Sequence, residues 1–164
     1  MLLEVFERID TFIFDVDGVL TNGQLLVMND GSLLRSMNIK DGYALQLAIK
    51  QGYKVIIVSG GNNESVRQRL IGLGVDNVHL GIHDKAIKLQ ELITADTLSL
   101  DRCLYMGDDM PDLAPMQIVG LPCAPQDACT EVLQAAKYVS PLKGGEGCVR
   151  DVIERVLKLH GKWQ

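Results

Sequence analysis

The sequence predicts an α/β protein in which a parallel sheet is covered by helices on both faces. Continuous apolar segments, rich in β-branched and aromatic residues, alternate along the chain with amphipathic segments. Strands of this kind are buried on both faces, and the helices that connect them provide the cover. Polar residues follow several of the predicted strands, at the edge where ligands bind in such sheets. The fold class is therefore a Rossmann-like parallel sheet.

Length and composition indicate one globular domain. The 164 residues suffice for a single domain, 1–164, and contain no repeat, low-complexity segment or linker. A net charge of −5 argues against nucleic acid or an anionic membrane as a partner. No signal peptide or membrane span is predicted, and the four cysteines show no CxxC spacing. We therefore expect reduced thiols and a cytoplasmic protein.

The first predicted strand covers residues 9–14, and two carboxylates follow it at Asp15 and Asp17. Residues two apart in a strand face the same side, so these carboxylates are expected to lie together. Like charges that close repel each other unless a cation or a proton intervenes. Gly18 then allows a sharp turn and the close approach of a ligand. A strand end with two solvated acids is the alternative interpretation.

A β-hairpin is predicted next, over about residues 23–38. Its arms, residues 24–28 and 33–37, flank the sequence Asn-Asp-Gly-Ser at 29–32, which suits a tight turn. The arms are apolar on more than one face, and a lone hairpin is marginal in water. We therefore expect it to pack against its own domain or, as we favour, against another subunit.

Helices and strands then alternate to the end of the chain. Asp41 and Asp84 can cap the starts of helices, and Gly52 and Gly74 can end them. The predicted strands cover residues 53–58, 77–80, 102–106, 119–122 and 138–139. The predicted helices cover residues 41–50, from 62 or 63 to 73, 84–94, 126–136 and 148–159.

Candidate site residues follow these strands. Asp15, Asp17, Ser59 and Asp108 all lie at predicted carboxyl ends, which share one edge of a parallel sheet. Taken alone, Ser59 also fits a plain turn, Lys85 a surface helix, and residues 107–112 a helix cap. Their convergence on one edge favours a common site.

Four motifs stand in a fixed order along the chain: Asp15-Val16-Asp17-Gly18-Val19-Leu20-Thr21, then Ser59, then Lys85, then Gly107-Asp108-Asp109-Met110-Pro111-Asp112. This order resembles that of the haloacid dehalogenase (HAD) superfamily, and the resemblance spans the whole chain. Most members are phosphatases that form an aspartyl-phosphate. The resemblance therefore implies a HAD-like fold and a phosphatase that depends on Mg²⁺.

The resemblance also implies a role for each residue. Asp15 would be the nucleophile and a metal ligand. Asp17 would bind the metal through its backbone carbonyl, and its side chain would act as general acid and then base. Asp108 would be the third ligand, supported by Asp109 and Asp112.

The remaining two motifs would meet the phosphate. Ser59 would hydrogen-bond a phosphoryl oxygen, and Lys85 would pair with both Asp15 and the phosphate. Several acids with one lysine suit an oxygen-ligated ion such as Mg²⁺ rather than zinc.

The spacing of the motifs leaves no room for the cap domain that many HAD members carry. The hairpin and the late segment 143–150, with three glycines, resemble the uncapped members that act on keto-deoxy sugar acid phosphates. That group includes the 3-deoxy-D-manno-octulosonate 8-phosphate phosphatases, in which hairpins assemble a homotetramer and neighbouring subunits cover each open site. The resemblance implies that the tail, about residues 143–160, helps with Arg150 to complete the site, in its own or a neighbouring subunit. A flexible loop before a helix is the alternative.

Position 61 bears on the substrate. Relatives for the eight-carbon sugar often carry Arg there and those for nine-carbon sugars Glu, whereas this chain has Gly60-Gly61. Glycine makes neither contact, so Arg67 or Arg69 would have to supply a cation. The expected substrate is 3-deoxy-D-manno-octulosonate 8-phosphate, in lipopolysaccharide synthesis. A nine-carbon sugar acid 9-phosphate (KDN or N-acylneuraminate) is the alternative.

Two other classes of protein share part of this pattern. An aspartyl-phosphate receiver domain also combines acids with a lysine, but its phosphorylated Asp follows the third strand. A non-catalytic oligomeric module associated with a sugar-nucleotide synthetase would use the hairpin but needs no complete set of catalytic motifs.

Overall fold

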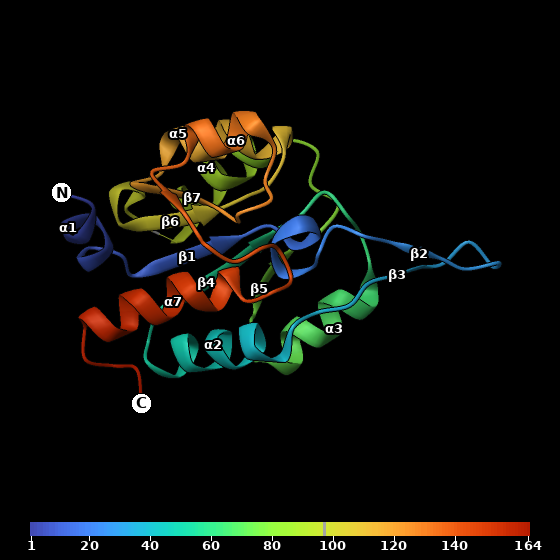
Figure 1. The fold of residues 1–164 in the computed structure, drawn as a ribbon, viewed down its shortest axis with the longest axis horizontal. Helices are drawn as coiled ribbons and strands as arrows, with labels where there is room; N and C mark the ends of the chain where they lie inside the picture. Colours follow the sequence, from blue (N-terminus) through green and yellow to red (C-terminus); the bar gives the residue numbers. More distant parts are fainter. Residues whose placement is uncertain (97) are drawn as a thin grey trace.

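A six-stranded parallel sheet forms the centre of the computed structural model, which describes residues 1–96 and 98–164 (Figure 1). The strand order is β5–β4–β1–β6–β7–β8, and every pairing is parallel. The order runs in opposite directions on the two sides of β1, so the carboxyl ends of β1 and β6 flank the position where such sheets bind ligands. The strands are β1 (Thr11–Phe14), β4 (Lys54–Val58), β5 (Asn77–His79), β6 (Cys103–Met106), β7 (Leu121–Ala124) and β8 (Tyr138–Val139).

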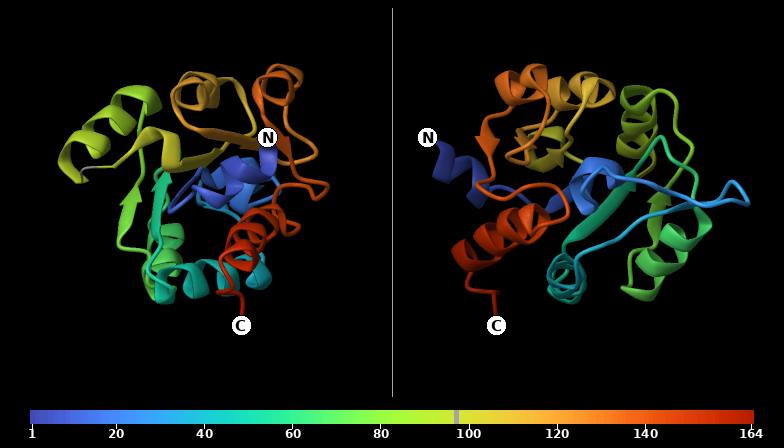
Figure 2. Two further views of the ribbon diagram at one scale, coloured as in Figure 1. Left: turned by 90° about the vertical axis from the view of Figure 1, so that its left-hand side faces the viewer. Right: turned by 45° about the vertical axis from the view of Figure 1, so that its right-hand side comes forward.

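Helices cover both faces of the sheet, as predicted (Figure 2). One face holds α1 (Leu2–Glu7), α2 (Ile39–Lys50), α3 (Glu64–Gly72) and α7 (Cys148–Leu159); the other holds α4 (Lys85–Asp96), α5 (Leu113–Ile118) and α6 (Thr130–Ala135). Strand β1 serves both: Phe12 and Phe14 pack in the first core and Ile13 in the second. Successive side chains of a strand point to opposite faces of the sheet, and both faces are buried here. The sequence of the strand is therefore continuously apolar.

The predicted hairpin is present and projects away from the body of the molecule (Figure 1). It pairs β2 (Leu26–Val27) with β3 (Leu33–Leu34), a shorter ladder than the predicted arms. Between β1 and β4 the described chain contains only a helical turn, this hairpin and α2, and between β4 and α4 only α3 and β5. Neither interval holds a cap domain, which confirms that prediction.

Several of the predicted boundaries are off by one or more residues, and three of these differences have a local cause. Asn38, and not Asp41, caps α2, since its side chain accepts from the backbone N of Lys40 at 2.8 Å. Strand β7 begins two residues later than predicted, because Gly120 N donates to Leu100 O at 2.8 Å, outside the sheet. Helix α6 begins only at Thr130, since the preceding residues form a loop in which Gln126 N donates to Leu142 O. Helices α1 and α5 were not predicted, because six-residue helices carry little periodicity.

Candidate active site

The loop after β1 places Asp15 at the centre of the site. Asp15 is buried, and its Oδ1 accepts from the backbone N of Val16 at 2.7 Å, capping the helical turn Val16–Leu20. The strand ends at Phe14, so the prediction that Asp15 and Asp17 share one strand face is wrong. Asp17 instead lies inside this turn with non-helical backbone angles, and its carboxylate turns toward the hairpin.

Lys85 links the first motif to the last. It is the first residue of α4, its side chain is 5% exposed, and its Nζ lies 3.0 Å from Asp15 Oδ2 and 2.8 Å from Asp112 Oδ1. Burial alone lowers the pKa of Lys85, but the two carboxylates outweigh it and the pKa is raised. The ammonium group is therefore firmly charged and holds Asp15 in one position.

Asp112 is held by four groups. Its Oδ1 accepts from Lys85 and, at 2.6 Å, from the Tyr105 hydroxyl. Its Oδ2 accepts from the backbone N of Asp108 at 2.9 Å and of Asp109 at 3.2 Å. Asp112 therefore fixes the loop after β6 and orients Asp108.

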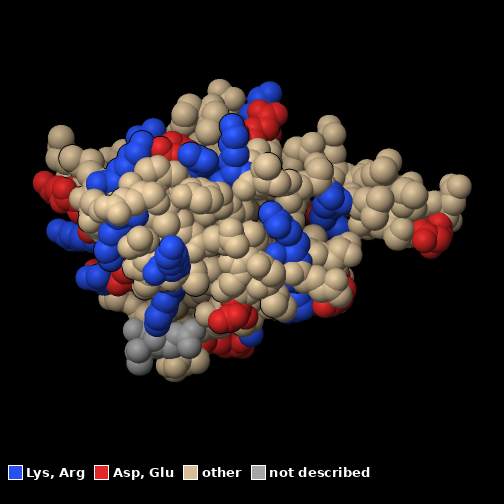
Figure 3. Space-filling model, turned by 90° about the horizontal axis from the view of Figure 1, so that it is seen from below, with Lys and Arg blue, Asp and Glu red and all other residues tan. Residues whose placement is uncertain are grey.

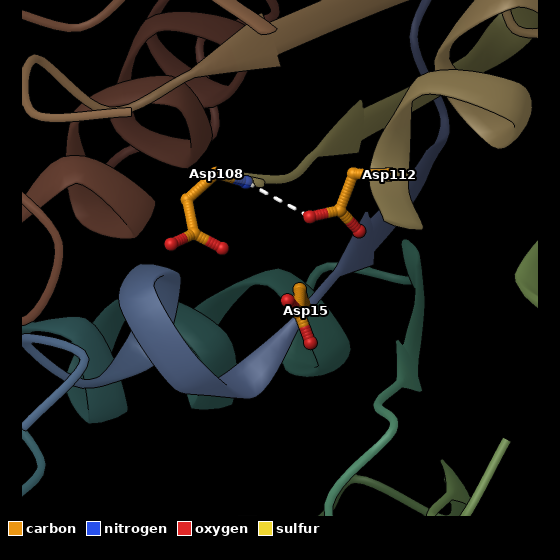
Figure 4. Close-up of side chains that lie close together, drawn as sticks. All are labelled: Asp15, Asp108 and Asp112. Carbon is orange, nitrogen blue, oxygen red and sulfur yellow. Dashed lines mark hydrogen bonds between the residues drawn. The ribbon is translucent and has the colours of Figure 1, made fainter. Parts of the chain in front are cut away.

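Three carboxylates face one another at this edge of the sheet. Ligand atoms of Asp15, Asp108 and Asp112 lie within 4.8 Å of one another, and Figure 4 shows the three converging. Burial, and then repulsion from Asp112, raises the pKa of Asp15 to about 6. Burial, and then repulsion from Asp15 and Asp112, raises the pKa of Asp108 to about 7. Buried oxygens that repel one another are a donor set suited to a hard divalent cation.

Gly18 makes this convergence possible. A Cβ placed there would overlap the carboxylate of Asp108, and its φ of +84° favours glycine. Two features therefore require glycine at this position of the first motif. The backbone turns in the left-handed region, and the last motif approaches it closely.

A cavity of about 440 Å³ opens over the three carboxylates. Ser59, which follows β4, is buried in its wall, and its Oγ accepts from Gly61 N at 3.3 Å. Nine of the predicted site residues line the cavity: Asp15, Asp17, Ser59, Gly60, Gly61, Lys85, Asp108, Asp109 and Asp112. Of these, Asp109 is exposed, and it caps the next helical turn through Met110 N.

Two predicted substrate-binding arginines lie elsewhere in this chain. Arg67 donates to Val78 O at 2.8 Å, and it is not among the residues that line the cavity. Arg150 pairs with Glu154 at 3.1 Å and lies over the ring of Trp163, with 5.1 Å between guanidinium and centroid. Any contact of Arg150 with a substrate would therefore involve a neighbouring subunit or a rearranged tail.

The glycine-rich segment lies against the back of the loop after β1. Gly145 N donates to Val19 O at 3.0 Å, and a Cβ on Gly144 would overlap the carbonyl of Gly18. Within this chain the segment therefore supports the loop that carries Asp15 and Asp17. Sequence reasoning missed this contact because it joins residues more than a hundred positions apart.

Three polar residues of the site were not predicted for it. Tyr105 holds Asp112, and His83 lines the cavity. Arg35, from the base of the hairpin, pairs with Asp17 through two nitrogens at 2.6 and 3.1 Å. No spacing in the sequence marks Arg35, since its placement depends on how the hairpin leaves the sheet.

Comparison with known proteins identifies the family. Residues 81–152 match the profile of haloacid dehalogenase-like hydrolases. Over 95% of its length the chain is 34% identical to the 3-deoxy-D-manno-octulosonate 8-phosphate phosphatase KdsC of Escherichia coli K12, of which it covers 83%. The chain therefore belongs to the haloacid dehalogenase-like hydrolases. Within them it is a phosphoric monoester hydrolase, which confirms the activity expected from the four motifs.

Solved structures agree with this family. The 3-deoxy-D-manno-octulosonate 8-phosphate phosphatase of Moraxella catarrhalis, in complex with magnesium, phosphate and KDO, is 30% identical with a TM-score of 0.92, covering 96% of this chain and 90% of that one. The cobalt-bound phosphatase of Haemophilus influenzae has the same identity and TM-score, covering 96% and 92%. A HAD-superfamily hydrolase from Legionella pneumophila is 37% identical with a TM-score of 0.95, covering 98% and 88%. The predicted HAD-like fold is confirmed.

One further expectation concerns membranes. Among the described residues, no helix combines the length and apolar character that a bilayer span requires.

Proposed function

We propose that this chain is a Mg²⁺-dependent phosphatase for a keto-deoxy sugar acid phosphate, with 3-deoxy-D-manno-octulosonate 8-phosphate as its substrate. The observation that carries the proposal is the buried cluster in which Lys85 bridges Asp15 and Asp112 beside Asp108. The relatives named for this substrate match nearly the whole chain. The Moraxella enzyme holds magnesium together with phosphate and KDO, the two products of such a hydrolysis.

Asp15 is the nucleophile in this proposal. One of its oxygens attacks phosphorus, and the bond from phosphorus to the sugar oxygen breaks, which gives an aspartyl-phosphate. Asp17 donates a proton to the departing sugar oxygen. It then takes a proton from a water that attacks phosphorus, and the bond to Asp15 breaks. Both carboxylates line the same cavity, which supports this division of roles.

Lys85 and Ser59 hold the reacting groups. Lys85 keeps Asp15 in place and offsets the charge of the phosphoryl oxygens. Ser59 Oγ accepts from Gly61 N, so its hydroxyl proton is available to a phosphoryl oxygen.

Mg²⁺ would be held by the carboxylates of Asp15 and Asp108 and by the backbone carbonyl of Asp17. When bound, the ion neutralises the negative phosphate oxygens that otherwise resist an anionic nucleophile. The raised pKa values of Asp15 and Asp108 fit a buried site whose negative charge Lys85 alone does not offset. Asp112 is already engaged by Lys85, Tyr105 and two backbone amides, so its role is support. Asp109 supports the same loop as the cap of its helical turn.

A homotetramer assembled through the hairpins is part of the proposal. Leu26 and Leu34, opposite each other in the hairpin, are 62% and 48% exposed. Figure 3 shows few charged side chains on the projecting hairpin, with acidic side-chain atoms close to its tip. An apolar arm of this kind calls for a partner surface. A neighbouring subunit could then bring its Arg150 and glycine-rich tail to the open cavity.

Four cysteines without disulfides support a reducing, cytoplasmic setting.

The substrate is tested by comparing kcat/KM across a panel with and without Mg²⁺. The panel contains 3-deoxy-D-manno-octulosonate 8-phosphate, the 9-phosphates of KDN and N-acetylneuraminate, and p-nitrophenyl phosphate. We expect the eight-carbon sugar acid to be hydrolysed most efficiently, and only with Mg²⁺. A higher kcat/KM for a nine-carbon sugar acid 9-phosphate would support the alternative substrate. A kcat/KM no higher for any sugar acid phosphate than for the aryl phosphate would refute the substrate class.

A further inference from the structure

The active-site cavity offers a substrate little positive charge. Among the described residues that line it, Lys85 is the only lysine or arginine, and it is already paired with Asp15 and Asp112. The proposed substrate carries two anionic ends, a phosphate and a carboxylate. Lys85 lies beside the nucleophile and suits the phosphate, so the carboxylate requires another cation.

Arg35 does not line this cavity itself but contacts the lining residue Asp17 from behind. Its Nε is 2.6 Å from Asp17 Oδ1 and its Nη2 is 3.1 Å from Asp17 Oδ2, a two-point pairing of guanidinium with carboxylate. The Arg35 side chain is 8% exposed, whereas that of Asp17 is 37% exposed. The buried guanidinium is therefore held by a carboxylate that remains accessible from the cavity.

The base of the hairpin is fixed where it delivers Arg35. Leu33 O accepts from Asn63 Nδ2 at 3.2 Å, which ties the returning arm to the N-cap residue of α3. Arg35 packs close to Asp17, Ser59 and Gly61, next to the carboxylate cluster, with no room for a water molecule among them. This anchoring places the guanidinium at the site even though the tip of the hairpin projects away.

Gly61 leaves the space that Arg35 uses. A Cβ on Gly61 would lie 3.2 Å from Asp17 Oδ2, 3.3 Å from Arg35 Nη2 and 3.7 Å from Ser59 Oγ. Even a methyl group there would be in tight contact with both the guanidinium and the Asp17 carboxylate. Glycine at position 61 therefore leaves room for the guanidinium that the hairpin brings to the site.

We propose that Arg35 binds the carboxylate of the substrate, exchanging its pairing with Asp17 for an equivalent pairing with that carboxylate. The inference rests on the proposed function, because it requires a sugar acid phosphate. One carboxylate replaces another on the same two guanidinium nitrogens, so the arginine keeps a partner throughout. The exchange also releases both oxygens of Asp17 for proton transfer. A substrate without a second anionic group leaves Asp17 paired.

Arg35→Ala tests this role against a matched control. We expect kcat/KM for 3-deoxy-D-manno-octulosonate 8-phosphate to fall by roughly 10- to 100-fold, as for loss of a charged hydrogen-bonding group. The fall for p-nitrophenyl phosphate should be clearly smaller, because this substrate has no carboxylate for Arg35 to bind. Arg102→Ala removes an exposed arginine that pairs with Asp10 at the same 2.6 Å distance, and it should change neither value.

A binding measurement separates carboxylate recognition from a general loss. Calorimetry with the product 3-deoxy-D-manno-octulosonate, which has a carboxylate and no phosphate, should show at least tenfold weaker binding to Arg35→Ala than to the parent. Binding of inorganic phosphate should be retained. Equal losses for both substrates, or unchanged binding of the product, would overturn the role of Arg35. A parent with no preference between the two substrates would instead overturn the proposed function.

Discussion

Replacing Asp108 by Asn should stabilise the metal-free protein while it weakens the response to Mg²⁺. Burial and the charges of Asp15 and Asp112 raise the pKa of Asp108 from 3.8 to about 7. The folded state therefore binds more protons than the unfolded state between these values, so stability falls as pH rises from about 4 to 7. About three pKa units at 1.36 kcal/mol each set a ceiling of roughly 4 kcal/mol. Because Asp108 is only half-buried, solvent screening reduces the expected gain to about 2 kcal/mol.

Urea unfolding in EDTA at pH 8 and pH 4.5, repeated with Mg²⁺ at pH 8, measures this effect. Asp108→Asn should exceed the parent by about 2 kcal/mol at pH 8 in EDTA, and the difference should fade at pH 4.5. The parent should gain more stability from Mg²⁺ than the variant. Asp76→Asn makes the same charge change at an exposed position and should show neither effect. A less stable variant at pH 8, or an equal gain from Mg²⁺, would refute the reasoning.

The remaining predictions concern assembly, position 61 and the tail. Replacing Leu26 and Leu34 together with Lys should yield smaller species in sedimentation, since unpaired charges would enter a buried interface; a monomeric parent would count against the interface. Gly61→Arg should lower kcat/KM for the sugar acid phosphate more in the parent than in Arg35→Ala, where the guanidinium is gone; additive losses would show that the two positions do not share space. Gly144→Ala should reduce kcat and destabilise the fold by about 1–3 kcal/mol, because its Cβ overlaps the catalytic loop; full activity would show that the loop tolerates the shift.

Local signals explain what could be predicted. Strand β1 and helix α7 were recognised because a continuous apolar run and a strongly amphipathic segment are visible within a dozen residues. The meeting of Asp15, Ser59 and Asp108 also followed from the sequence, because the carboxyl ends of neighbouring parallel strands share an edge.

Contacts between distant segments explain what was missed. Asp41 has the residue type of a helix cap, yet it lies buried within α2 and accepts from the backbone N of Arg150 at 2.8 Å. Arg35 reaches Asp17 only because the hairpin base is tied to α3. Neither placement leaves a pattern in the neighbouring sequence, since each depends on how two separate elements pack.

The covalent intermediate on Asp15 offers the most direct test of the mechanism. The protein is mixed with Mg²⁺ and ³²P-labelled 3-deoxy-D-manno-octulosonate 8-phosphate, quenched in acid within one turnover, and the label is located by peptide mapping. We expect hydroxylamine-labile label on Asp15 in the parent and none in Asp15→Asn, which keeps the shape of the residue but lacks the nucleophilic charge. Turnover by the parent without labelled protein, or label on Asp15→Asn, would contradict the assignment of Asp15 as the nucleophile.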